Sequence, residues 1–162
     1  MKHLTLAAAA LSIAAFTGPV LADAASGNTE SVIAARAALD QWLGAFNARD
    51  LDALMAQYDE EIVYLNAGAP AAIGPDAVRA SFQGMFGAVE GFTLHYKELQ
   101  AFGGTDMAVL IGTYMLEPPA GVEVPAPTGR VSLVYRLADD GTWKLIHDID
   151  NNPPDATPAV FE

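Results

Sequence analysis

The feature that most narrows the fold is a change of hydrophobic period near Phe92. Before this point the apolar residues recur every three or four positions, and after it apolar and polar residues alternate. Four alternating segments, 92–102, 107–117, 130–137 and 143–150, follow one another with turn signals between them. Because no helical segment separates them, we expect neighbouring strands in an antiparallel sheet.

Three helical segments precede these strands. The first runs from Glu30 to about Ala48, and its apolar residues fall on one face. The second, 51–58, follows Asp50, a residue type that commonly caps a helix N-terminus. The third begins at Pro75, where the missing N–H costs nothing, and ends near residue 87. A short strand, 62–65, and a loop, 66–70, are expected between the second and third helices.

The N-terminal residues predict export. A basic start at residues 1–3 precedes the uncharged, apolar stretch 4–16, and small residues then allow cleavage after Ala22 or Ala24. The stretch is shorter than the roughly 20 residues of a membrane-spanning helix. The alternative is a buried N-terminal helix. We predict a signal peptide over residues 1–24, a periplasmic or secreted location, and no membrane association after signal removal.

Residues 25–162 are expected to form one domain with a core of its own. The chain has no cysteine, which excludes disulfides, thiol nucleophiles and cysteine-bound metals. Its formal net charge of −12 argues against nucleic-acid partners and anionic membrane surfaces.

One predicted strand is apolar on both faces. Between Met107 and Leu116 the alternate sets Val109, Ile111 and Ala108, Leu110 are all apolar. One face can pack against the core, and the other needs a cover. We therefore predict a homodimer.

Several segments closely resemble the nuclear transport factor 2-like superfamily, which includes SnoaL-like and ketosteroid-isomerase-like domains. They are the helix junction 46–54, the strand entry 58–64, the loop and helix start 68–78, and the last strand around 141–148. The resemblance implies an α+β, cone-shaped fold in which three N-terminal helices pack on a curved, mostly antiparallel sheet that encloses a pocket. Members of this superfamily include isomerases, cyclases, dehydratases, epoxide hydrolases and binding modules, so the resemblance does not name a reaction.

The same resemblance argues against strict ketosteroid isomerase chemistry. The position of the isomerase's carboxylate base corresponds to Asn66, whose neutral amide cannot take a proton. The position of its protonated aspartic acid falls near Leu133. Both acidic groups are therefore missing from this chain.

The last predicted strand supplies other candidates for acid–base chemistry. Strict alternation places Lys144, Ile146, Asp148 and Asp150 on one face and Trp143, Leu145, His147 and Ile149 on the other. If the first set faces the pocket, two carboxylates lie about 7 Å apart along the strand, and each disfavours ionisation of the other. If the second set faces inward, His147 is the candidate general base. The apolar residues of the second set slightly favour its burial, and both alternatives stay open.

Aromatic side chains are expected to line a pocket for a small organic ligand, because tyrosines combine apolar surface with a hydrogen-bond donor. The predicted ligand-binding residues are Trp42, Tyr58, Tyr64, Asn66, Phe82, Phe86, Tyr96, Tyr114 and Tyr135. His95 and His147 show no metal-ligand spacing, and no phosphate loop or dinucleotide fingerprint is present. We expect no metal and no cofactor.

Two functions remain open from the sequence. The first is a cofactor-independent isomerase, cyclase or dehydratase that acts on a small, mostly apolar molecule, with Asp148, Asp150 or His147 moving the proton. The second is a non-catalytic ligand-binding or dimerisation domain.

Overall fold

The computed structural model describes residues 29–162. The predicted signal peptide, residues 1–24, lies outside the described residues. No helix within the described part is both long and apolar enough to cross a membrane.

The three helices begin at the residues that the sequence predicts. Helix α1 spans Glu30–Ala48; the Thr29 side chain accepts a hydrogen bond from the Val32 N–H at its start, and Arg49 ends it in the left-handed conformation. Helix α2 spans Leu51–Met55, and the Asp50 carboxylate accepts from the Ala53 N–H. Helix α3 spans Pro75–Ala88, with proline in its first turn.

Six strands form one sheet in the order β2-β1-β6-β5-β4-β3. The strands are β1 (Tyr58–Leu65), β2 (Ala72–Ile73), β3 (Thr93–Gly103), β4 (Met107–Glu117), β5 (Thr128–Leu137) and β6 (Trp143–Asn151). The four long strands pair antiparallel in chain order, as the alternation predicts, and β1 pairs parallel with β6. A short 3-10 helix, η1 (Pro158–Phe161), follows β6.

The boundary between the second helix and the first strand differs from the prediction. Helix α2 ends at Met55, and β1 begins at Tyr58 rather than Ile62. The cause is pairing with the last strand: Tyr58 lies beside Leu145, whose N–H donates to the Gln57 carbonyl at 2.9 Å. Strand β2 forms between the predicted loop, 66–70, and the third helix, where no strand was predicted.

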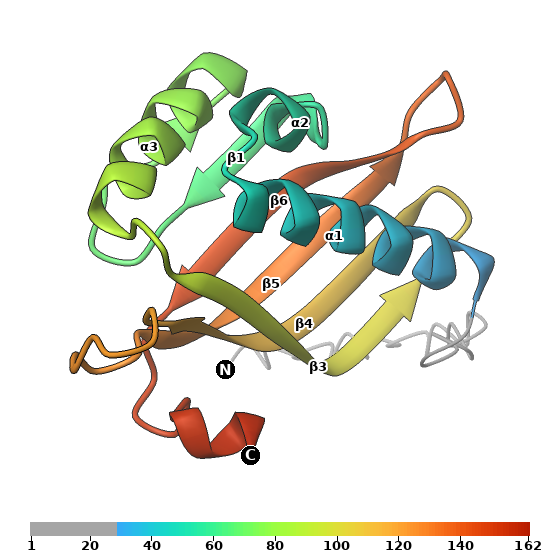
Figure 1. Cartoon of the computed structure of the whole chain (residues 1–162). Helices are drawn as coiled ribbons and strands as arrows, with labels where there is room; N and C mark the ends of the chain where they lie inside the picture. Colours follow the sequence, from blue (N-terminus) through green and yellow to red (C-terminus); the bar gives the residue numbers. More distant parts are fainter. Residues whose placement is uncertain (1–28) are drawn as a thin grey trace, which may run out of the picture.

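The helices lie on one face of the curved sheet, with α1 running across it and α3 beside β1 (Figure 1). Phe46 of α1, Phe82 of α3 and Leu110 of β4 are almost fully buried between the two layers. This arrangement confirms the α+β architecture expected from the resemblance.

The opposite face of the sheet carries apolar residues that stay partly exposed. Val109 and Ile111 of β4 lie opposite Val134 and Ser132 of β5, whereas their neighbours on β4 point toward the helices and are buried. The C-terminal segment packs against the edge of this outer face, where the Thr128 hydroxyl donates to the Ala156 carbonyl.

Candidate functional site

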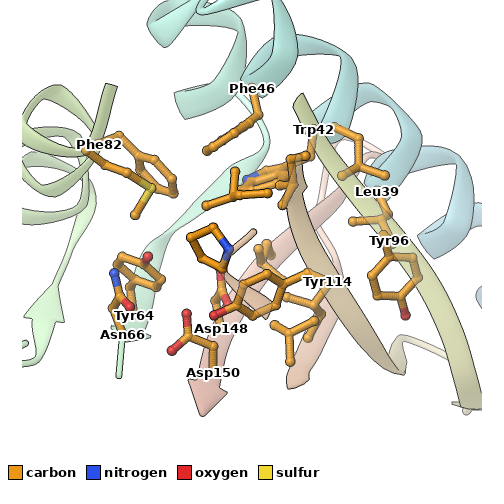
Figure 2. Close-up of a pocket in the computed structure, with 18 of the residues that line it drawn as sticks. Leu39, Trp42, Phe46, Tyr64, Asn66, Phe82, Tyr96, Tyr114, Asp148 and Asp150 are labelled. Atoms are coloured by element: carbon orange, nitrogen blue, oxygen red, sulfur yellow. The ribbon is translucent and has the colours of Figure 1, made fainter. Parts of the chain in front are cut away.

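A cavity of about 320 Å³ lies between the helices and the inner face of the sheet. Its wall is formed by residues of α1, α3 and every long strand, and most of them are apolar or aromatic. Figure 2 shows the rings of Phe46, Trp42 and Phe82 on the helical side and the carboxyl groups of Asp148 and Asp150 at the sheet side. A cavity of this size and character suits a small organic molecule.

A bulge in β6 sets which side chains reach the cavity. Tyr135 pairs with Leu145, but the preceding residue Val134 pairs with His147, so the register skips Ile146. The extra residue moves the alternation by one position. Leu145 and Asp148, which strict alternation assigns to different faces, therefore both line the cavity.

Asp148 is a buried carboxyl group on an apolar wall, with 5% of its surface exposed. Burial first, and the nearby charge of Asp150 second, raise its pKa from 3.8 to about 7, while a hydrogen bond from the Tyr58 hydroxyl opposes the rise. Asp148 thus exchanges a proton near neutral pH, which is the property that general acid–base catalysis requires.

Asp150 also lines the cavity, two residues further along β6. Partial burial raises its pKa, whereas the Ala67 N–H, which donates to Oδ1 at 2.5 Å, and the Tyr114 hydroxyl favour its ionised form. The two carboxyl groups therefore differ: Asp148 is the more buried, whereas Asp150 accepts hydrogen bonds that favour its carboxylate form.

The tyrosines of the cavity are proton donors rather than bases. Burial, followed by the charges of Asp148 and Asp150, raises the pKa of Tyr64 and Tyr114 above 10. The Tyr96 hydroxyl is buried, has no hydrogen-bond partner among residues 29–162, and points away from Asp148 and Asp150 (Figure 2). The hydroxyl groups of Tyr64 and Tyr114 keep their protons at neutral pH and can donate to an oxygen atom of a ligand.

The structure brings together most of the residues predicted to bind a ligand. Those that line the cavity are Trp42, Tyr64, Asn66, Phe82, Tyr96 and Tyr114. Three others do not line it: Tyr58 is buried beneath the wall, Phe86 packs on the rings of Phe46 and Phe82, and Tyr135 is fully buried. Tyr58 instead accepts a hydrogen bond from the Trp42 Nε1 atom at 2.9 Å.

His147 lies on the face opposite Asp148. It pairs with Val134 and Val63, and it is not part of the cavity wall. The bulge accounts for this placement, because it leaves Leu145 inside the fold while turning His147 outward.

Two wall residues occupy the positions that the resemblance assigns to isomerase acids. Asn66 and Leu133 both line the cavity, and Leu133 lies directly opposite Asp148 on the neighbouring strand. The Asp148 carboxyl group therefore lies on the strand next to the position that the resemblance assigns to the protonated aspartic acid of the isomerase. Asn152, another wall residue, was not predicted, although extending the alternation from Asp148 and Asp150 by two residues finds it.

No candidate metal centre is found within residues 29–162, where no group of three or more His, Asp or Glu side chains converges. The cavity wall also lacks Lys, Arg and His. Its chemistry therefore comes from two carboxyl groups, two amides and several phenols.

Solved structures with this fold include the following three. A candidate association domain of calcium/calmodulin-dependent protein kinase type II from Thiobacillus denitrificans is 27% identical, with a TM-score of 0.65 over 73% of this chain and 94% of that one. A ketosteroid isomerase-like protein from Erwinia carotovora atroseptica is 23% identical (TM-score 0.65; 76% and 96%). A nuclear transport factor 2-like protein of unknown function from Pseudomonas putida is 24% identical (TM-score 0.68; 79% and 90%). No curated protein sequence matches the chain.

The fold and the cavity between its helices and sheet define a nuclear transport factor 2-like pocket protein. Within that class the chain belongs to the SnoaL-like domain family, whose family model matches residues 39–146. Asp148 and Asp150 follow directly after the matched segment. The family membership therefore establishes the pocket but leaves the roles of these two carboxyl groups to be derived from their geometry.

Proposed function

We propose that the protein is a cofactor-independent acid–base enzyme, an isomerase, cyclase or dehydratase of a small, mostly apolar molecule. The observation that carries this proposal is Asp148, a carboxyl group buried in an apolar cavity with a pKa of about 7. A carboxyl group with this pKa can take and return a proton at neutral pH.

The proposed first step is removal of a proton from a carbon beside a carbonyl group. The Asp148 carboxylate takes the proton, the C–H electron pair becomes the enolate, and a tyrosine hydroxyl such as that of Tyr114 or Tyr64 stabilises the oxygen. For isomerisation, protonated Asp148 returns the proton to another carbon of the enolate. For elimination, the enolate electron pair forms a C=C bond, the C–O bond at the neighbouring carbon breaks, and protonated Asp148 gives its proton to the departing oxygen.

The experiment that tests this proposal measures proton exchange without knowledge of the natural substrate. The protein is incubated in D₂O with a panel of small, mostly apolar ketones, amino ketones included, and deuterium uptake at the carbon beside the carbonyl is followed by NMR. We expect exchange above the buffer rate, and Asp148→Asn should lower it about 10²-fold or more. The control is Asp139→Asn, which removes an exposed carboxylate from a turn. Absence of exchange with every ketone, or full exchange by Asp148→Asn, would overturn the proposal.

We further propose that the protein works outside the cytoplasm, in the periplasm or as a secreted protein. The support is the basic start, the apolar stretch 4–16 and the small residues near Ala22. N-terminal sequencing of the protein purified from its native compartment tests this, and an intact Met1 would contradict it.

The competing function is a non-catalytic ligand-binding or dimerisation domain. It is favoured by Asn66 and Leu133, which replace isomerase acids, and by the apolar outer face of the sheet around Ile111. The similar protein from Thiobacillus denitrificans is named as an association domain. In this proposal a second copy of the chain covers the outer face, and the cavity binds a ligand without turning it over.

A further inference from the structure

The charge of the cavity restricts what can enter it. Asp148 and Asp150 are the carboxylic acids of the wall, and among residues 29–162 no Lys, Arg or His lines it. A carboxylate or phosphate on a ligand would therefore meet two carboxyl groups in a partly desolvated space, with no cation to offset the repulsion. The cavity therefore disfavours anionic ligands.

The basic side chains of the described residues are engaged elsewhere. Arg49 is the one that contacts the wall most directly: its guanidinium lies over the Phe46 ring, and it donates to the carbonyls of Val89 and Phe92. His147 lies on the face of β6 turned away from the cavity. The others bond to acids or carbonyls away from the cavity, and they are Arg36, Arg79, His95, Lys97, Arg130, Arg136 and Lys144. None of these cations lines the space that Asp148 and Asp150 face.

The remainder of the wall also suits a positive charge. The rings of Trp42, Phe46, Phe82 and Tyr114 surround the cavity above the two carboxyl groups (Figure 2). Aromatic faces attract cations through their quadrupoles, and more strongly where water is excluded. Carboxylates at one side and aromatic rings around the rest form a receptor for an ammonium group on an apolar body.

We propose that the substrate of this cavity is a small, mostly apolar molecule that carries one protonated amine, which pairs with Asp150 and Asp148. The inference rests on the proposed function, because it assigns the substrate class of the same site. Asp150 is the first partner for the ammonium group, because its ionised form is already held by the Ala67 N–H. Asp148 lies two residues further inside on the same strand face.

The amine would also prepare Asp148 for catalysis. A cation beside a carboxyl group favours its ionised form, so binding lowers the pKa of Asp148 and leaves a carboxylate base next to the substrate. The groups that face Asp148 from the surrounding strands are Tyr58, Tyr64, Tyr114, Tyr135 and Asp150. The tyrosines keep their protons below pH 10, so the two aspartates control the pH dependence. The affinity for an amine must rise between pH 6 and pH 8, as Asp148 ionises.

The test uses three compounds that share one skeleton and differ in charge: phenylbutylamine, phenylbutanol and phenylbutanoate. Their affinities for the purified protein are measured by calorimetry at pH 6 and pH 8. We expect the amine to bind about tenfold or more tightly than the alcohol at pH 8, with a smaller advantage at pH 6, and the carboxylate to bind most weakly. Asp150→Asn and Asp148→Asn should reduce the amine's advantage, while Asp139→Asn should leave it unchanged.

The result that overturns the inference is equal or tighter binding of the alcohol or the carboxylate, or an amine advantage that persists in the Asp148→Asn/Asp150→Asn double variant. The exchange experiment separates this failure from failure of the proposed function. If the protein exchanges ketone protons but binds the alcohol more tightly than the amine, the amine substrate is refuted and the proposed enzyme activity stands. If the protein prefers the amine but exchanges no ketone, amino ketones included, the amine ligand is supported and the proposed enzyme activity is refuted. The protein is then a binding protein.

Discussion

The indole Nε1 of Trp42 donates to the Tyr58 hydroxyl across 2.9 Å, and that hydroxyl in turn donates to the buried Asp148. Helix α1, strand β1 and strand β6 are thus joined by one chain of hydrogen bonds behind the cavity wall. These hydrogen bonds hold the Tyr58 hydroxyl in position. It donates to the Asp148 carboxylate, favours its ionised form, and so opposes the rise in pKa that burial causes. Tyr58 is therefore a positioning residue for Asp148.

Tyr58→Phe is expected to raise the pKa of Asp148 above its wild-type value. The change removes a hydrogen bond to the carboxylate and leaves the ring in place, so the neutral acid is favoured. Carbon-13 NMR of the aspartate carboxyl groups measures the shift. Tyr135→Phe is the matched control, because the buried Tyr135 hydroxyl has no hydrogen-bond partner. A lowered or unchanged pKa in Tyr58→Phe would show that Tyr58 does not act on Asp148.

Asp148→Asn is expected to alter how stability depends on pH. The carboxyl group has a pKa of 3.8 when unfolded and about 7 when folded, so the folded state holds its proton more tightly. The contribution of this group to the free energy of unfolding is fully present below pH 3.8. It falls as the pH rises from 3.8 to about 7, and it changes little above that. Between pH 5 and pH 8 the wild type should lose about 3 kcal/mol relative to Asp148→Asn.

Urea unfolding of both proteins at these two pH values measures this difference. Asp139→Asn, which changes an exposed turn residue, should follow the wild type at both pH values. Parallel behaviour of wild type and Asp148→Asn would mean that Asp148 ionises normally in the folded protein.

Two glycines are expected to set the width of the cavity. A Cβ atom at Gly112 would lie 2.1 Å from the Tyr96 ring, and one at Gly129 would lie 2.5 Å from the Tyr114 hydroxyl. Either Gly→Ala change must push a tyrosine off the sheet and into the cavity, which should weaken binding of the tightest phenylbutyl compound and cost about 1–3 kcal/mol.

Gly44→Ala is the control for both variants. It lies within α1 with nothing within 4 Å of an added Cβ, so it should gain about 0.5–1 kcal/mol and keep its affinity. Urea unfolding and calorimetry measure the two effects. Wild-type affinity in Gly112→Ala and Gly129→Ala would show that the tyrosine rings do not bound the ligand.

Ile111→Glu is expected to convert a homodimer into monomers. Ile111 lies on the outer face of the sheet, and a buried glutamate without a partner would oppose association. Light scattering gives the mass in solution. Ile33→Glu is the control, because Ile33 is 57% exposed on α1. A wild-type mass that Ile111→Glu leaves unchanged would contradict an interface at this face.

The sequence predicts the fold well because its signals are periodic. The cap at Asp50, the proline at the start of α3 and the alternation of the four long strands depend on local chemistry, and these helices and strands begin close to their expected first residues. Family resemblance supplies the cavity that these local signals do not define.

The site is less predictable because it depends on long-range pairing. The bulge at Ile146 arises from the register between β5 and β6, and no residue near it marks an interruption of the alternation. This bulge decides between Asp148 and His147 as the inward group. In the same way, the parallel pairing with β6 brings Tyr58 into a strand, although its local spacing also fits the end of a helix.

The most direct test of the proposed acid–base site is the pKa of Asp148 in the wild-type protein, measured by carbon-13 NMR with Asp148→Asn to assign the signal. We predict a value of about 7, because the carboxyl group is buried beside Asp150 in an apolar cavity. A value near 4, the ordinary value of an exposed aspartate, would contradict both the buried acid–base site and the enzyme proposed from it.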